Sequence, residues 1–381
     1  MSVSVIHSVM NLATVMVKLI LKRMGPATLL WATFLWAAVP AAEAAPVGLT
    51  YREVPLASAA ARRSDHRPLL DLTIWYPAVG GTAQEEVDVG PPGQALLVGG
   101  PAAIDAEPAH GAHPVVLLSP GFGGSAEDLS WLGGGLAARG FVVVGVSHPG
   151  NNALDRTPVG GTAWWERPRD LIAAARAMAT DPALGPHLDL GHVGAAGFSM
   201  GGMTALALGG AVIDPGHFDD FCAGKPADQV CDTAPETPDA PHVTQRAGIH
   251  MLGLDQAAAR ASEGAALPGL RAVLAIAPPV QMLSPESLGR ITARTTLMVG
   301  DSDPLVPAAT EAGVAARLVK DARLVMVPGA AHYSFVGICT PHGRTVLKLC
   351  ERAPEAERAH TAALTEAVRL FQDTLSPGGR P

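Results

Sequence analysis

The sequence predicts an α/β fold in which helices cover both faces of a mostly parallel central sheet. Short apolar strands alternate with helical segments, and titratable residues follow closely after several of these strands. The 381 residues, 48% of them hydrophobic, are enough for one large core. Strands buried on both faces read as continuous apolar runs, as seen at residues 115–118, 141–147, 271–276, 296–299 and 324–327.

The first 44 residues predict a secretory signal peptide. Three cations precede an apolar run at residues 27–39, and Ala42-Glu43-Ala44 supplies an A-x-A cleavage site. We therefore expect an exported domain over residues 45–381, periplasmic or secreted, with no stable membrane span after cleavage. An uncleaved membrane anchor is the alternative.

Composition limits the partners. The formal net charge is −8, and no run of Lys or Arg follows the N-terminal segment. Nucleic acid is therefore not expected as a partner, because binding it requires a basic face.

Four cysteines fit an exported protein. Cys222 and Cys231 bracket one short loop, and Cys339 and Cys350 bracket another. Of the three connectivities, the two local pairings are the simplest, and each would add about 2–3 kcal/mol. A zinc site is disfavoured, because the sequence has no C-x-x-C.

The N-terminal part of the domain predicts antiparallel strands over residues 46–76. Apolar residues alternate with other residues from Leu70 to Tyr76, and Pro77 ends the strand. Residues 78–112 are rich in Gly, Pro and Ala and predict a loop with a short hairpin.

Helical patterns lie between the strands. We expect helices at residues 126–139, capped by Gly140, and at residues 171–179, 314–318 and 355–375. Residues 212–268 interrupt the alternation with several prolines, among them Pro215, Pro226, Pro235, Pro238 and Pro241, and a helical stretch at 243–263. This segment predicts a cap or lid insertion over the sheet edge.

One strand passes directly into a helix at Gly197-Phe-Ser199-Met-Gly201, a match to G-x-S-x-G. Such a turn strains the middle residue, and a Cβ at either glycine would collide with neighbouring backbone. The pattern predicts that Ser199 is a nucleophile; a structural turn is the alternative. The Met200 N–H at the helix start would face a developing oxyanion.

A second oxyanion donor is expected after the strand at 115–118. There Ser119-Pro-Gly-Phe122-Gly-Gly124 forms a glycine-rich turn, and the Phe122 N–H is the candidate. An ordinary turn is the alternative. A phosphate-binding loop is disfavoured, because no Lys-Ser/Thr pair follows the glycines.

An acid and a base follow later strands in the order Ser, Asp, His, which α/β-hydrolases use. His332, after the last strand, is the expected base, and Asp303 is the expected acid that holds its ring. Asp301 competes with Asp303 but suits an Asx turn. His342 and His360 compete with His332, although neither follows a strand.

Three further residues are candidates for the substrate pocket. His148 follows a strand at the edge where α/β ligands bind, and we interpret it as lining or structural. Trp164 and Trp165 either wall an acyl pocket or cover a helix start. We interpret the nearby Arg167, Arg169 and Asp170 as a structural ion-pair group.

Five motifs carry a family resemblance: Trp75-Tyr-Pro77, the turn at 119–124, Gly197–Gly202, Gly300-Asp-Ser-Asp303 and Gly329-Ala-Ala-His-Tyr-Ser-Phe335. They resemble the predicted dienelactone-hydrolase family of exported α/β-hydrolases. This group is similar to plasma-type platelet-activating-factor acetylhydrolases and, more distantly, to cutinase-like polyester hydrolases. The resemblance implies Ser199, Asp303 and His332 as the triad. True dienelactone hydrolases use a cysteine where this chain has Ser199.

The sequence thus predicts a serine carboxylic-ester hydrolase acting on a small-molecule or lipid ester without a metal or organic cofactor. A lipase or phospholipid deacylase would use the same triad, as would a polyester hydrolase, although the 212–268 insertion would obstruct a polymer. A non-catalytic binding protein on the same fold is the alternative of a different class.

Overall fold

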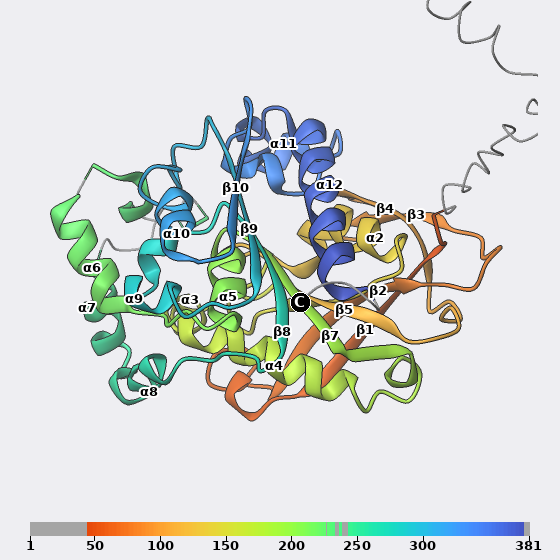
Figure 1. Ribbon diagram of the computed structural model, residues 1–381, viewed down its shortest axis with the longest axis horizontal. Helices are drawn as coiled ribbons and strands as arrows, with labels where there is room; N and C mark the ends of the chain where they lie inside the picture. Colours follow the sequence, from red (N-terminus) through yellow and green to blue (C-terminus); the bar gives the residue numbers. More distant parts are fainter. Residues whose placement is uncertain (1–43, 226, 233–235, 238–242, 377–381) are drawn as a thin grey trace, which may run out of the picture. The chain divides into compact units, whose positions relative to one another are not determined.

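The computed structural model describes residues 44–225, 227–232, 236–237 and 243–376. Residues 1–43 of the predicted signal peptide lie outside them. Ten strands of this part of the chain form one sheet in the order β10-β9-β8-β7-β5-β6-β2-β1-β4-β3 (Figure 1). They are β1 (Val47–Pro55), β2 (Leu69–Pro77), β3 (Glu85–Val89), β4 (Leu97–Ile104), β5 (His113–Ser119), β6 (Val142–Ser147), β7 (Leu188–Phe198), β8 (Leu270–Ile276), β9 (Arg294–Gly300) and β10 (Ala322–Val327).

The centre of this sheet is parallel, as the sequence predicts. Strands β5 to β10 pair with one another only in parallel, whereas β2 is antiparallel to both β1 and β6. Because the carboxyl ends of parallel strands meet at one edge, the segments that follow β5, β7, β9 and β10 converge there.

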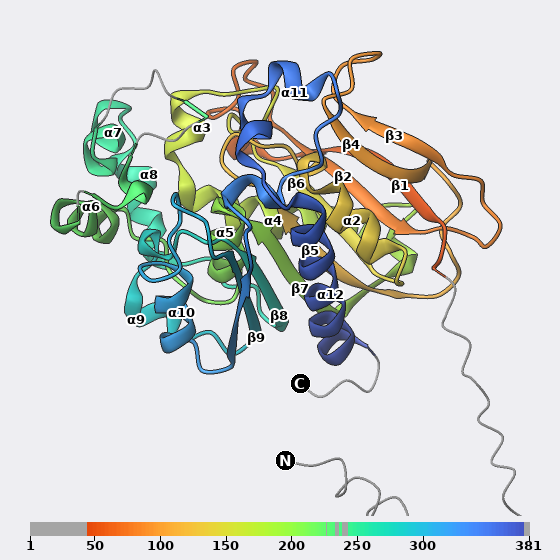
Figure 2. The same cartoon turned by 90° about the horizontal axis from the view of Figure 1, so that it is seen from above.

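Helices cover both faces of the sheet (Figures 1 and 2). One apolar cluster packs α2 and α12 on one face, and a second packs α4, α5, α9 and α10 on the other. The described helices are α2 (Ser130–Ala137), α3 (Pro158–Thr162), α4 (Arg167–Met178), α5 (Met200–Leu208), α6 (Pro215–Gly224), α7 (Gln245–Met251), α8 (Asp255–Ala259), α9 (Pro285–Leu288), α10 (Ala312–Leu318), α11 (Gly343–Val346) and α12 (Ala356–Leu375). None of these helices has the length and apolar character needed to cross a bilayer.

Strand β2 explains how the two clusters are divided. Leu70, Leu72 and Ile74 belong to one cluster, and Trp75 belongs to the other. The period-two pattern therefore sorts residues between faces, as in any strand. Thr73 is also buried, so the sequence alternation separates two covered faces rather than a core from solvent.

The stretch at 78–112, predicted as a loop with a short hairpin, widens the sheet. Strands β3 and β4 form an antiparallel hairpin with an irregular register between Glu86 and Asp88. Strand β4 also pairs in parallel with β1 at Gly48 and Leu49. This pairing attaches the hairpin to the sheet edge.

The predicted helix at 126–139 begins as a 3-10 turn, Ala126–Leu129, before α2. A capping box between Ser125 and Asp128 starts this turn, which satisfies backbone N–H groups at the helix entrance. Gly140 follows α2 with a φ of 93°, in keeping with the predicted cap.

The 212–268 insertion contains α6, α7 and α8 (Figures 1 and 2). Both views place these helices at the end of the domain opposite the β3–β4 hairpin. The disulfide Cys222–Cys231 closes a loop within the insertion, and Cys339–Cys350 closes a second loop before α12. The two local pairings predicted from the sequence are those observed.

Helix α12 supplies one stability test. Phe371 is fully buried and packs on β7, where a Cβ at Gly194 would stand 2.6 Å from its ring. Phe371→Ala should cost about 3–5 kcal/mol through lost burial and a residual cavity. Thermal unfolding should show a clearly lower Tm. Leu190→Ala, at a 40% exposed position on β7, is the control and should shift Tm far less.

Candidate active site

Ser199 lies on a sharp elbow between β7 and α5. Its φ of 54° and ψ of −122° fall where non-glycine residues are strained. Its N–H donates to the Ile276 carbonyl of β8 at 2.8 Å, which fixes the turn. A Cβ at Gly197 would collide with the backbone of Gly201, and a Cβ at Gly201 would collide with the Ser119 carbonyl. The collisions expected from the sequence are therefore present.

Two further side chains form a hydrogen-bonded series with Ser199. His332 Nε2 lies 3.0 Å from Ser199 Oγ, and His332 Nδ1 lies 2.8 Å from Asp303 Oδ2. Both the imidazole and the carboxylate are buried. The geometry suits a neutral imidazole that donates from Nδ1 to Asp303 and accepts the Ser199 hydroxyl proton at Nε2.

The loop after β9 holds the carboxylate in place. Asp303 Oδ1 accepts the N–H groups of Leu305 at 2.9 Å and Val306 at 3.0 Å. These bonds leave Oδ2 for the imidazole. The competing Asp301 is exposed and accepts the Gly329 N–H at 2.7 Å, so it closes the turn instead.

The other two candidate histidines lie elsewhere. His342 is exposed before α11. His360, on α12, bonds to the Val336 carbonyl at 2.9 Å and stacks on Trp131 with ring centroids 4.1 Å apart. Burial lowers the pKa of His360 to about 4. This histidine is therefore a neutral packing residue.

The backbone N–H groups of Phe122 and Met200 are available to a ligand. Neither donates a hydrogen bond to another described residue, and Met200 begins α5, where N–H groups have no partner within the helix. A Cβ at Gly121, next to Phe122, would lie 3.5 Å from Ser199 Cβ. Phe122, Ser199 and Met200 line one cavity.

Two cavities meet at Ser199. The hairpin-side cavity, about 650 Å³, extends between the glycine-rich loop at 119–124, the β3–β4 hairpin and the loop at 339–350. The cap-side cavity, about 570 Å³, extends under the 212–268 insertion and is also lined by His332. Four residues line both: Phe122, Ser199, Glu236 and Tyr333.

A hydrogen-bonded bridge separates the two cavities. The Tyr333 hydroxyl donates to Glu236 Oε1 at 2.7 Å, and Arg156 donates to the Glu236 carbonyl at 3.3 Å and the Gly123 carbonyl at 3.0 Å. Burial, with the Glu236 charge, raises the pKa of Tyr333, so its hydroxyl stays protonated. The insertion is thereby tied to the segment that carries His332 and Tyr333 and to the glycine-rich loop at 119–124.

Of the three predicted pocket residues, only Trp164 lines a cavity. It stands edge-on to Phe218 of the insertion, with centroids 5.4 Å apart. Trp165 is instead buried in a separate apolar cluster with Ile249 and Ala261. It covers the contact between α4 and the insertion. Sequence adjacency could not distinguish the two rings, because they point to different neighbours.

His148, also predicted near the pocket, is buried beneath it. Its Nε2 lies 2.9 Å from Ser119 Oγ, and its Nδ1 lies 2.9 Å from Asp170 Oδ2. Burial, reinforced by the Arg167 charge, lowers the pKa of His148 to about 3. A neutral, doubly hydrogen-bonded imidazole is a structural part of the loop support and has no route to the cavity.

The predicted ion-pair group has a partner that the sequence did not indicate. Asp170 binds the Arg62 guanidinium with both oxygens, at 2.7 and 2.8 Å. Burial alone would raise the pKa of Asp170, but the Arg62 charge outweighs it and lowers the pKa to about 2. Arg169 donates to the carbonyls of Trp165 and Arg260 rather than to Asp170.

Arg167 holds the glycine-rich loop at 119–124 by hydrogen bonds. It donates to the Pro120 carbonyl at 2.6 Å, to Ser119 Oγ at 3.3 Å and to Asn151 Oδ1 at 2.9 Å. Burial lowers the pKa of Arg167 to about 9. Arg62, His148, Arg167 and Asp170 therefore form a buried ionic network under the loop that carries Phe122.

Glu311 is a further buried carboxyl that the sequence reasoning missed. Its Oε2 accepts the Gln281 N–H at 3.0 Å, and its Oε1 has no partner among the described residues. Burial raises the pKa of Glu311 well above the usual value. Through the Gln281 N–H, this carboxyl connects the turn after β8 to the segment that precedes α10.

Comparison by family model and sequence finds relatives over part of the chain. The model "PETase: PET hydrolase-like" matches residues 100–211, a stretch that includes Phe122 and Ser199. Cutinase est2 of Thermobifida alba is 34% identical over 95 residues, 24% of this chain and 29% of the cutinase. The bis(hydroxyethyl) terephthalate hydrolase of Streptomyces coelicolor is 32% identical over 96 residues, 25% of this chain and 28% of that protein. The chain aligns with less than a third of each curated relative's length.

Comparison of structures extends over nearly the whole chain. Ferulic acid esterase from Streptomyces cinnamoneus superimposes with a TM-score of 0.57 at 20% identity, covering 90% of this chain and 93% of the esterase. This chain has the α/β-hydrolase fold. The predicted fold class is confirmed.

Asp128 gives a pH-dependent test of the hairpin-side cavity. Its carboxyl lines the cavity, and burial, with the Glu127 charge, raises its pKa to about 7 from the model-peptide value of 3.8. A raised folded pKa stabilises the protein below the unfolded value, and this contribution is lost as pH rises through about 7. Asp128→Asn cannot ionise and can still accept the Ser125 N–H.

The Tm of Asp128→Asn should therefore rise relative to wild type as pH increases from 4.5 to 8. Paired thermal scans at several pH values measure this difference. A difference that stays constant, or that falls with pH, would contradict the raised pKa.

Proposed function

We propose that the protein is a serine hydrolase of carboxylic esters. The observation that carries the proposal is the series Asp303–His332–Ser199, with bonds of 2.8 and 3.0 Å, where two cavities meet. A neutral hydroxyl is a weak nucleophile, and this arrangement supplies the base that activates it and the carboxylate that orients the base.

In the first half-reaction, Ser199 Oγ attacks the ester carbonyl carbon while its proton passes to His332 Nε2. Asp303 stabilises the imidazolium without becoming protonated. The tetrahedral intermediate collapses, the bond from the carbonyl carbon to the alcohol oxygen breaks, and His332 gives its proton to that oxygen. The products are the free alcohol and an acyl group on Ser199.

In the second half-reaction, water replaces the alcohol. His332 takes one proton from the water as its oxygen attacks the acyl carbon, and then returns it to Ser199 Oγ. The carboxylic acid leaves, and the resting enzyme is restored without a metal or organic cofactor.

The N–H groups of Phe122 and Met200 stabilise the oxyanion in both halves. Donors fixed before the reaction need no reorganisation, and the loss of one such donor costs about 2.7–4 kcal/mol in studied proteases. Here both donors are backbone groups, so the buried ionic network under Ser119 and Pro120 is what holds one of them in position.

Polyester or aryl-ester hydrolysis is the second candidate. The relatives are named as cutinases and as a bis(hydroxyethyl) terephthalate hydrolase, and the structural neighbour as a ferulic acid esterase. One feature argues against long polymers as substrates. The 212–268 insertion lines the cap-side cavity and acts as a lid that limits access to Ser199. A lipid ester, as in platelet-activating-factor acetylhydrolases, is the alternative among small substrates.

Export is part of the proposal. Residues 1–44 act as the signal peptide and 45–381 as the hydrolase domain, and the two disulfides suit an oxidising compartment. The proposal keeps the resemblance of its five motifs to the predicted dienelactone-hydrolase group, with serine as the nucleophile.

Ser199→Ala tests the proposal on a series of p-nitrophenyl esters from acetate to palmitate. Removing a catalytic serine lowers kcat by up to about 10⁶-fold in studied serine proteases, and we expect a loss that leaves only the background rate. The chain-length optimum of the unmutated protein separates esterase from lipase. Equal rates for both proteins on every ester would refute Ser199 as the nucleophile and favour a binding protein.

Asp303→Asn, compared with Asp301→Asn, tests the choice of acid. Replacing the carboxylate that orients the imidazole is expected to lower kcat by about 10⁴-fold, as in chymotrypsin-like proteases. Asp301→Asn keeps an oxygen that can accept the Gly329 N–H and lies outside the hydrogen-bonded series, so kcat should stay close to the wild-type value. A larger loss of kcat in Asp301→Asn than in Asp303→Asn would reverse the assignment.

A further inference from the structure

The hairpin-side cavity has an apolar wall built from segments far apart in the sequence. The β3–β4 hairpin contributes one part, the disulfide-closed loop at 339–350 contributes another, and the interior side chains of the domain contribute the rest. The apolar residues of this wall are Val89, Leu96, Leu97, Leu129, Phe198, Val336, Leu347 and Leu349.

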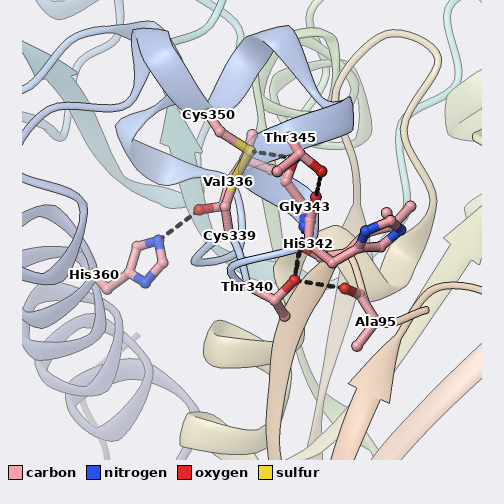
Figure 3. The surroundings of a disulfide bond; sticks show 10 residues. Ala95, Val336, Cys339, Thr340, His342, Gly343, Thr345, Cys350 and His360 are labelled. Atoms are coloured by element: carbon pink, nitrogen blue, oxygen red, sulfur yellow. Dashed lines mark hydrogen bonds between the residues drawn. A yellow bond between two sulfur atoms is a disulfide. The ribbon is translucent and has the colours of Figure 1, made fainter. Parts of the chain in front are cut away.

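The loop that carries Leu347 and Leu349 is fastened to the hairpin (Figure 3). Thr340 Oγ1 donates to the Ala95 carbonyl at 2.5 Å, and the Thr340 N–H donates to the Leu96 carbonyl at 3.0 Å. The Gly343 N–H in turn donates to Thr340 Oγ1 at 2.9 Å.

Close packing and a covalent link complete the attachment. A Cβ at Gly343 would collide with the Leu96 carbonyl, so the loop lies directly on the hairpin backbone. The Cys339–Cys350 disulfide closes the loop on itself (Figure 3). The wall is therefore a preformed surface, which is typical of small-molecule sites.

The cap-side cavity has a different chemical character. The insertion contributes the apolar residues Phe218, Val230 and Val243 to its lining, and with them the polar residues Asp219, Gln229, Asp232, Thr244 and Gln245. The hairpin-side cavity also has polar groups, Glu127, Asp128 and Arg156. Its leucine-rich wall has no counterpart among the residues that the insertion contributes to the cap-side cavity.

We propose that the hairpin-side cavity binds one apolar half of the ester, of aryl or branched-alkyl size, and that the cap-side cavity binds a polar half. The proposal rests on the proposed function, because Ser199 lines both cavities and the scissile carbonyl must lie beside it. A group on either side of that carbonyl can then enter one cavity, while the Tyr333–Glu236 bridge keeps the two halves apart.

The preferred substrate class follows from size and chemistry. A cavity of about 650 Å³ accommodates an aromatic ring with substituents. Each methylene buried against the leucine wall is expected to raise kcat/KM about fourfold until the cavity is full. Esters that join such a group to a short polar partner should therefore be hydrolysed with a higher kcat/KM than esters with two small halves.

Leu349 provides the test, because it lines the cavity and is only partly buried. Two ester series are measured: p-nitrophenyl esters with acyl groups from acetyl to cinnamoyl and octanoyl, and acetates with alcohols from methyl to benzyl and octyl. Leu349→Trp fills the cavity, and Leu349→Ala enlarges it. Val346→Trp is the matched control on the same loop, since Val346 is 54% exposed and lines neither cavity.

In Leu349→Trp, the ratio of kcat/KM for the bulky ester to that for the small ester should fall at least about tenfold, in one of the two series only. Leu349→Ala should move the optimum of that same series toward larger groups, and Val346→Trp should keep the wild-type ratio. The series that responds identifies whether the acyl or the alcohol half enters the cavity.

Unchanged ratios in both series for Leu349→Trp and Leu349→Ala would overturn the proposal, as would an equal change in Val346→Trp. Should Leu349→Trp fail to fold, as judged by circular dichroism, the proposal is tested by Leu349→Ala alone, through the shift of its optimum toward larger groups. Failure of the proposed function is distinct, since the wild-type protein would then match Ser199→Ala on every ester in both series.

Discussion

The close approach of three backbones at Ser199 is the constraint on which the rest of the structure depends. Gly197 and Gly201 let β7, α5 and the end of β5 approach so closely that any side chain there would collide. This contact holds Ser199 at a φ of 54°. The strain exposes the hydroxyl at the carboxyl edge of the parallel strands, the edge that also carries Asp303 and His332.

A buried ionic network stabilises the neighbouring glycine-rich loop at 119–124. Charged groups are costly to bury, and they are tolerated here because Asp170 binds Arg62 with both oxygens and Arg167 donates to four oxygen acceptors. The neutral His148 completes the network by linking Asp170 to Ser119. The chain thus uses costly buried polar groups to fix a loop whose own glycines give it little rigidity.

The surroundings of the elbow come from segments that the core does not need. The 212–268 insertion and the β3–β4 hairpin lie at opposite ends of the domain; the hairpin lines one cavity beside Ser199, and the insertion lines the other and adds Glu236 to both. A disulfide closes a loop next to each cavity. The central sheet is thus shared with other proteins of the α/β-hydrolase fold, whereas the shape of the cavities depends on these peripheral segments.

The sequence by itself determined the features that depend on local chemistry. Apolar runs located the central strands, glycine spacing located the elbow, and the order of Ser199, Asp303 and His332 followed from strand ends meeting at one edge. Both local disulfides were also predictable from spacing.

Tertiary structure alone decided the contacts between distant segments. It paired Asp170 with Arg62, buried His148 and Trp165 away from the cavities, and placed Leu349 opposite the hairpin. Sequence reasoning could not reach these, because such contacts depend on which surfaces meet after the chain has folded.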